Sequence, residues 1–364
     1  MRPLIVLLNF GLAAGLATLP FAAKPAPHAP LEVPQESSFA GWLKDGSMLI
    51  TTRRGNDTQL ERVRAPLGGR ELLPLGPGAV RDVAIRPAAG GDGFAFARQP
   101  DGTGPWQLFH HDFDVGKTTQ LTHVTQGGAQ GALWSPDGRQ LAYSSTERTG
   151  VDSDLWLLDI ETREHRLLVG EGGNWLAKGF SPDARQLLVM KLVSRGESVP
   201  GKLDLASGRL QMFPVDGGKA AFGAFVYAPD GKGSYYVSNE GAKHMTLRNH
   251  DVVNNSFREF GAGSDTDVNE FGLASDGRHL AYSEIQPEAD RLHVLALPAH
   301  QPLRVPPLPA GRIHELGFSP DGKRLAFTVY APELPGEIYV LDIDNGDLIR
   351  WTIGDSGDRG NAHD

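Results

Sequence analysis

The sequence predicts an all-β protein, a seven-bladed β-propeller of four-stranded antiparallel blades. Three observations predict this fold. A Ser-Pro-Asp-Gly-type turn recurs at an almost constant spacing, short apolar strands surround each turn, and no stretch has the 3.6-residue periodicity of a long helix. Four short strands in each repeat of this length are the signature of a propeller blade.

The repeated turn is built around an aspartate. "WSPDGRQLAYSS" (134–145) and "FSPDGKRLAFTV" (318–329) are almost the same segment. Proline presets the first dihedral angle of such a turn, aspartate accepts hydrogen bonds from nearby backbone, and glycine adopts a positive φ. The aspartates of the series are Asp45, Asp92, Asp137, Asp183, Asp230, Asp276 and Asp321. The copy that contains Asp92 is the weakest.

Strands are expected on both sides of each turn. The strand before the turn ends on an aromatic or aliphatic residue, such as Trp134 or Phe318, and a short apolar strand follows the turn. "DLWLLDI" (154–160) exemplifies the third strand of a blade and "DLIRWTI" (347–353) the fourth. The same strands could form a solenoid or a sandwich. Seven evenly spaced units favour a closed ring, because each blade then buries both of its faces against neighbours.

The two ends of the repeat series predict how the ring closes. The first repeat supplies four strands of its own, beginning with "SSFAGWL" (37–43), and the last repeat ends with its own fourth strand. No strand is left over for exchange between them. We therefore expect blades one and seven to meet by side-chain packing, without a shared sheet.

The chain divides into four parts. Residues 1–23 have a short positive start and an apolar run, which predict a signal peptide, with an uncleaved anchor as the alternative. Residues 24–34 form a proline-rich linker, 35–353 the propeller and 354–364 a polar tail. We expect a periplasmic or secreted bacterial protein that has no stable membrane span once the signal is removed.

Composition restricts the possible partners and cofactors. The chain has 364 residues, no cysteine and a formal net charge of −9. An acidic surface disfavours nucleic acid, because binding to a phosphate backbone needs a basic surface. Without cysteine an exported fold gains nothing from disulfides, so its core must suffice. We expect no cofactor, and the oligomeric state stays open.

Several short motifs imitate catalytic sites without completing them. A nucleophile elbow needs Gly-x-Ser-x-Gly, whereas "GESVP" (196–200) and "GDSGD" (354–358) each have the wrong last residue. "DVGKTT" (114–119) resembles the end of a phosphate-binding loop, but His111 occupies the position of its first glycine. A hairpin turn is the expected structure of that segment.

No metal site is expected either. The neighbouring histidines of "HHD" (110–112) point to opposite faces of a strand and cannot chelate together. "DIDNGD" (342–347) begins like a calcium loop but lacks the later glutamate, so a hairpin turn is expected. Four tryptophans at repeat positions are expected in the core: Trp134, Trp156, Trp175 and Trp351. We assign no catalytic, cofactor-binding or metal-binding residue, and the ligand-binding residues stay unknown.

The repeats resemble known propellers. Their "FSPDGKRLAF" pattern is similar to the TolB-type repeat. Two longer segments, 172–198 and 308–352, the latter ending Arg350-Trp351-Thr352, resemble the N-terminal propeller of bacterial serine peptidases of the prolyl oligopeptidase family, which includes dipeptidyl and acylaminoacyl peptidases. The resemblance covers essentially the whole chain after the signal segment.

This resemblance implies a function. In that family the propeller precedes an α/β-hydrolase domain with a Ser-Asp-His triad, covers its active site and restricts access to peptides. The present chain ends soon after Thr352, so we expect the hydrolase domain to be absent and the chain to be inactive alone. It would then be the non-catalytic, substrate-gating or peptide-binding part of an exported peptidase.

Two other functions stay open. The chain could be a stand-alone TolB-like periplasmic propeller that binds protein partners through its channel or loops. It could also be a propeller enzyme such as a lyase or lactonase. Such an enzyme needs a ring of histidines or carboxylates around the axis, and no histidine or glutamate recurs in phase at a strand start.

Overall fold

The computed structural model describes residues 36–54, 57–215, 217–251, 256–261 and 265–353. The predicted signal peptide (1–23), linker (24–34) and polar tail (354–364) lie outside the described residues. Within the described ranges, none of the helices has the length and apolar character that crossing a bilayer requires.

The described chain forms seven separate four-stranded antiparallel sheets. Blades one to four contain β1 (Glu36–Trp42), β2 (Met48–Arg54), β3 (Asp57–Val63), β4 (Arg70–Leu72); β5 (Val80–Ile85), β6 (Gly93–Arg98), β7 (Gln107–Asp112), β8 (Lys117–Gln120); β9 (Ala129–Trp134), β10 (Gln140–Ser145), β11 (Asp154–Asp159), β12 (His165–Val169); and β13 (Asn174–Phe180), β14 (Gln186–Ser194), β15 (Glu197–Asp204), β16 (Leu210–Met212).

Blades five to seven contain β17 (Phe222–Tyr227), β18 (Gly233–Ser238), β19 (Thr246–Asp251), β20 (Ser256–Phe260); β21 (Val268–Leu273), β22 (His279–Glu284), β23 (Arg291–Ala296), β24 (Gln301–Pro302); and β25 (Arg312–Phe318), β26 (Arg324–Ala331), β27 (Leu334–Asp342), β28 (Leu348–Arg350). One short 3₁₀ helix, η1 (Ala88–Gly90), precedes β6. The predicted all-β, seven-bladed fold is confirmed.

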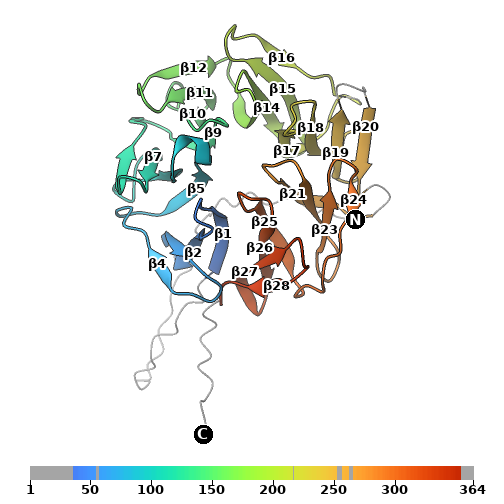
Figure 1. Cartoon of the computed structure of the whole chain (residues 1–364). Helices are drawn as coiled ribbons and strands as arrows, with labels where there is room; N and C mark the ends of the chain where they lie inside the picture. Colours follow the sequence, from blue (N-terminus) through green and yellow to red (C-terminus); the bar gives the residue numbers. More distant parts are fainter. Residues whose placement is uncertain (1–35, 55–56, 216, 252–255, 262–264, 354–364) are drawn as a thin grey trace, which may run out of the picture.

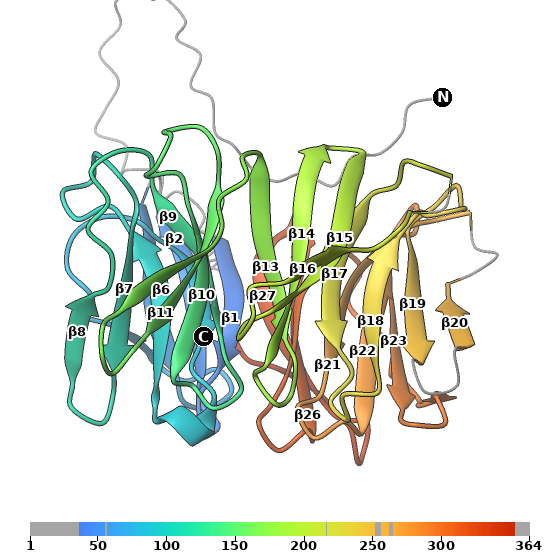
Figure 2. The same cartoon turned by 90° about the horizontal axis from the view of Figure 1, so that it is seen from above.

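The blades stand side by side around a central axis. Figure 1 looks along this axis: the first strand of each blade is the innermost, and the fourth lies at the rim. Figure 2 shows the ring from the side, with the strands running between its two faces. Both faces of a sheet therefore contact neighbouring blades, which explains why the second strands, such as β6 and β26, are almost entirely buried.

The predicted turn is built by side-chain hydrogen bonds. In blade three the Ser135 hydroxyl donates to Asp137 over 2.6 Å, and the backbone N–H of Arg139 donates to the same carboxylate. Blades four and seven repeat these contacts. Gly138 adopts the expected positive φ of 67°. These hydrogen bonds lower the pKa of Asp137, because they favour its charged form.

The expectation for Asp92 is wrong. The segment from Ile85 to Phe94 is two positions longer than its counterpart in blade three. The additional residues form η1, and Gly91 takes the positive φ at the end of the turn. Asp92 therefore lies directly before β6 and outside the turn, although it keeps the spacing of the series.

Blades one and seven close the ring without exchanging a strand, as predicted. The Trp42 indole N–H donates to the carbonyl of Gly317 over 3.0 Å, and its ring meets Trp351 edge-on at 5.4 Å. One backbone hydrogen bond, from Leu67 N–H to the Trp351 carbonyl, adds to this packing. The ring is therefore closed chiefly by buried side chains.

Candidate functional site

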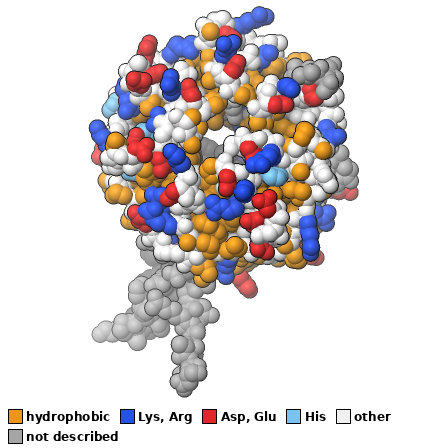
Figure 3. Space-filling view, viewed as in Figure 1, with side chains coloured by type: hydrophobic (Ala, Val, Ile, Leu, Met, Phe, Trp, Pro, Cys, Tyr) orange, Lys and Arg blue, Asp and Glu red, His pale blue; other side chains and the backbone are white. Residues whose placement is uncertain are grey.

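The innermost strand is irregular in all seven blades. Its register against the second strand slips within the strand each time. We call the unpaired residues the axial bulges. They are Ala40, Asp82–Val83, Gly131–Ala132, Lys178, Gly223–Ala224, Asn269 and Glu315–Leu316. A bulge redirects a side chain away from the regular pleat, so the candidate site is this ring around the axis. The face seen in Figure 3 is hollowed near its centre.

Blade six holds the bulge of blade seven by side-chain hydrogen bonds. The backbone N–H of Glu315 donates to the Glu270 carboxylate over 2.7 Å, and the His314 ring lies 3.2 Å from the same carboxylate. The Asn269 amide donates to the carbonyl of Ile313 over 3.2 Å. The carboxylate of Glu270 therefore fixes a backbone that would otherwise have unpaired N–H groups at the axis.

Glu315 lies in a strained and mostly enclosed position. Its φ of 55° is in the left-handed region, which costs a non-glycine residue about 1–2 kcal/mol. The Tyr330 hydroxyl lies 3.3 Å from its carboxyl group and 2.5 Å from the Ser38 hydroxyl of blade one. Burial raises the pKa of Glu315 to about 7, and the hydrogen bond to Glu270 raises the pKa of His314. The Glu315 carboxyl group can therefore exchange a proton near neutral pH.

The bulge of blade two carries an exposed carboxylate. Asp82 has a φ of 53°, and its side chain is 37% exposed. The neighbouring Arg81 is already engaged: its guanidinium donates to Gln130 over 3.0 Å and lies 3.6 Å from the centre of the Trp106 ring. The Arg81 guanidinium also lies 3.7 Å from the Asp82 carboxylate, so the two form a partly exposed ion pair on this side of the axis.

Blades four and five provide an apolar wall with one charge. Gly179 lies so close to blade five that a Cβ there would be 3.4 Å from the Cα of Val226. The bulge residue before it, Lys178, is mostly buried, and burial lowers the pKa of its ammonium group. In blade five the unpaired residues are Gly223 and Ala224.

The carboxylates at the axis were missed by the sequence analysis. Asp82, Glu270 and Glu315 each lie three positions before the last residue of their innermost strand. They therefore recur in phase, but in the middle of a strand, whereas the expectation concerned strand starts. Counting back from the strand-ending aromatic or aliphatic residue would have found them.

The motifs considered from sequence are parts of the scaffold. His110 meets Trp134 edge-on at 5.4 Å, whereas the His111 ring hydrogen-bonds Thr118, so the two histidines face opposite sides as predicted. Burial lowers the pKa of His110 to about 4. Among the described residues, no group of three or more His, Cys, Asp or Glu side chains is placed to hold a metal ion.

The two loop motifs are hairpin turns. In 114–119 the backbone N–H groups of Asp114 and Val115 donate to Asp112, and in 342–347 Asp342 accepts two backbone N–H groups in the same way. The four predicted core tryptophans all belong to or contact buried clusters. In "GESVP" Gly196 precedes β15 and the other four residues begin that strand, whereas "GDSGD" lies outside the described residues.

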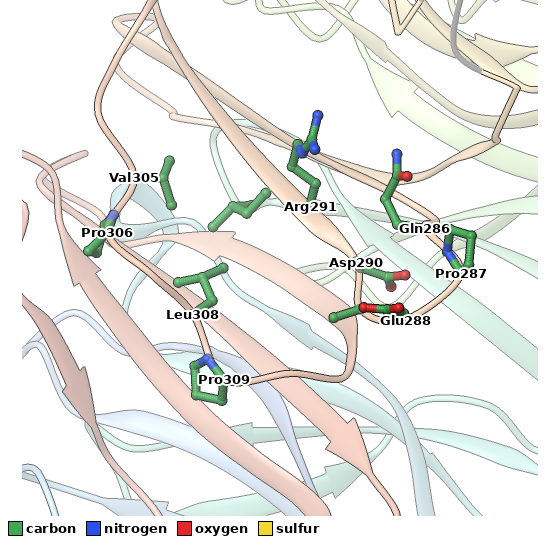
Figure 4. A pocket seen from close by; sticks show the side chains of 11 residues that line it. Gln286, Pro287, Glu288, Asp290, Arg291, Val305, Pro306, Leu308 and Pro309 are labelled. Atoms are coloured by element: carbon green, nitrogen blue, oxygen red, sulfur yellow. The ribbon is translucent and has the colours of Figure 1, made fainter.

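Two pockets lie away from the axis. An open pocket of about 690 Å³ in blade six is lined by the residues around Glu288 and Arg291 and by the segment 305–309 (Figure 4). It exists because the fourth strand, β24, is only two residues long, and the following leucines pack on blade seven. A second cavity of about 500 Å³ lies between the turns of blades two and three. Neither contains a nucleophile beside a base.

The ring is similar to solved peptidase structures. One, from a study of two prolyl endopeptidases, matches 88% of this chain with a TM-score of 0.69 and 16% identity, over 50% of that chain. A puromycin-hydrolysing peptidase of Mycobacterium tuberculosis matches 88% of this chain with a TM-score of 0.70 and 16% identity, over 53% of that chain. The present chain thus spans about half the length of these proteins.

Other similarities are weaker or shorter. TolB of Acinetobacter baumannii matches 85% of this chain with a TM-score of 0.51 and 16% identity, over 76% of that chain. Dipeptidyl-peptidase 5 of Porphyromonas gingivalis is 30% identical over 123 residues, which are 30% of this chain and 18% of that protein. No protein-family model matches the chain. The chain is a seven-bladed β-propeller that resembles the propellers of prolyl peptidases and of TolB.

Proposed function

We propose that this propeller is the non-catalytic, peptide-binding and gating part of an exported serine peptidase of the prolyl oligopeptidase type. The observation that carries the proposal is the ring of axial bulges, which places Asp82, Lys178, Asn269 and Glu315 on the strands that line the axis. The similarity to peptidase propellers supplies the class of ligand. Peptides would enter or bind at the channel and its loops.

The chemistry of the axis suits an extended peptide. Each innermost strand has one edge without a strand neighbour, so backbone N–H and C=O groups face the axis. Polar side chains at the bulges add hydrogen-bonding groups, and the apolar wall of blades four and five can accept aliphatic side chains. Peptide recognition commonly uses this combination of strand edge and side-chain contacts.

A stand-alone interaction propeller of TolB type is the second candidate. The similarity to TolB of Acinetobacter baumannii covers 76% of that chain, whereas each peptidase match covers only about half. In this case the ligand would be a protein bound at the loops of one face, where binding residues commonly lie. Export to the periplasm is part of both proposals and rests on the N-terminal sequence.

The test combines peptide binding with the size of the native product. We expect the purified chain to bind neutral, acetylated and amidated pentapeptides in calorimetric titrations, and to bind a folded protein of similar composition far more weakly. An antibody to the propeller should detect a native product well above the 39.2 kDa of this chain. A product of that mass or smaller, with no peptide binding, would overturn the peptidase proposal in favour of the TolB-type one.

A further inference from the structure

Lys178 is the charged residue in the apolar wall that blades four and five form beside the axis. It is the single unpaired residue between the pairs Ala177–Val189 and Gly179–Leu188, so it lies at the bulge of the innermost strand of blade four. It is mostly buried but keeps some accessible surface. Within the part of the chain that the structure describes, its ammonium group has no hydrogen-bond or ion-pair partner, and it is not fully enclosed by protein.

An unpaired cation in such a place is costly. Transfer of an ammonium group out of water is unfavourable unless hydrogen bonds or an opposite charge replace the lost hydration. Burial is the only cause of the lowered pKa of Lys178, and no carboxylate opposes it. A leucine or methionine would fill the same volume without this cost. A ligand with a negative group would therefore supply the partner that the Lys178 ammonium group lacks.

The charged side chains around the axis are distributed unevenly among the blades. Carboxylates lie on blades two, six and seven, at Asp82, Glu270 and Glu315, while Lys178 stands on blade four among apolar bulges. Blade four lies across the ring from blade seven (Figure 1). A negative group in the opening would be attracted toward Lys178.

We propose that Lys178 binds a carboxylate of a peptide held in the central channel. The proposal rests on the proposed function and adds to it a preference among peptides. The ammonium group donates charge-assisted hydrogen bonds to the carboxylate oxygens, which replaces the hydration lost by burial. The carboxylate comes either from the C-terminus of the peptide or from an acidic side chain.

The test compares four acetylated alanine pentapeptides by calorimetric titration of the full chain. One has a free C-terminus and one a C-terminal amide; the other two are amides with a central Glu or Gln. We expect at least one carboxylate peptide to bind about tenfold or more tightly than its neutral partner. Lys178→Met should abolish this preference, so that each carboxylate peptide binds no more tightly than its neutral partner. Lys178→Arg should retain it.

Lys202→Met is the matched control, because Lys202 lies in the same blade on β15, the third strand from the axis. Equal binding of all four peptides by the wild type would overturn the proposal and leave peptide binding intact. A preference that survives Lys178→Met would also overturn it. If no peptide binds, the proposed function fails as well. We expect Lys178→Met to fold with a midpoint at least that of the wild type, because it removes an unpaired buried charge.

Discussion

At the scale of single residues, Glu315 makes the stability of the ring depend on pH. Its pKa is raised from 4.5 to about 7, so the folded state holds this proton more tightly than the unfolded chain does. The stabilising contribution is complete below about pH 4.5 and is lost as pH rises toward 7. The raised pKa of His314 acts in the same direction. Glu270 and Tyr330 are the other titratable groups in contact with this pair.

We therefore expect the thermal unfolding temperature of the wild type to decrease as the pH is raised from 5 to 8. Glu315→Gln keeps a hydrogen-bonding group beside Tyr330 but cannot ionise. It should stabilise the protein at pH 8 by up to roughly 3 kcal/mol and have little effect at pH 5. Thermal unfolding across this range measures the slope. Glu71→Gln, at an exposed carboxylate, is the control. Parallel slopes for wild type and Glu315→Gln would exclude this role.

Ala184 offers a stabilising substitution. It occupies the turn position that glycine holds in blade three, with a φ of 55°. The left-handed conformation costs alanine more than glycine, so Ala184→Gly should raise the free energy of unfolding by up to about 1 kcal/mol. The reverse change, Gly138→Ala, should destabilise, because its Cβ would lie 2.8 Å from the Cα of Gly90. Denaturant unfolding of both variants tests whether the first substitution raises the free energy of unfolding and the second lowers it.

At the scale of the element, the turns differ in the number of hydrogen bonds that hold them. Asp137 accepts hydrogen bonds from Ser135 and from the backbone of Arg139, whereas Asp230 has Ala228 in place of the serine and accepts only from backbone N–H. Asp137→Ala should cost about 1–2 kcal/mol, and Asp230→Ala about half of that. Because hydrogen bonding lowers the pKa of Asp137, its contribution should disappear as pH falls through that pKa. Equal losses in the two variants would contradict the role of the serine.

The turns were predictable from sequence because each one is encoded within a few residues. Proline, aspartate and glycine act on their own backbone, so spacing alone located six of the seven. The prediction for Asp92 was wrong because an insertion of two residues moved the turn without changing the spacing of the aspartates. The axial bulges were not predictable in the same way. Whether Lys178 or Asn269 loses its pairing depends on the register between two strands, which no local pattern encodes.

At the scale of the whole molecule, the interface between blades one and seven holds the ring closed. Trp42 there contacts Trp351 and has Arg324 over its ring at 4.4 Å. Trp42→Ala should lower the free energy of unfolding by about 3–5 kcal/mol. Trp156→Ala, at a half-buried ring whose N–H has no partner in the described structure, should cost less than half as much. Calorimetric unfolding of both variants compares them, and similar losses would show that the closing interface is not special.

The number of blades was predictable, whereas the polarity of the axis was not. Seven copies of a turn count the blades directly, and complete sets of strands at both ends indicated closure without exchange. The charges of Asp82, Glu270 and Lys178 gain meaning only when the ring brings their strands together. Sequence order separates them by tens of positions, and only the closed geometry makes them neighbours of one opening.

Because every blade is built from one uninterrupted stretch of chain, the closing interface joins two complete sheets, as the other six interfaces do. The described fold should therefore tolerate circular permutation: new ends placed between β12 (His165–Val169) and β13 (Asn174–Phe180), with the old ends joined, would leave every sheet intact. By the same logic, the gain or loss of one repeat during evolution would change the width of the central opening without rethreading any strand. The ring is modular in a way that a propeller closed by a shared blade is not.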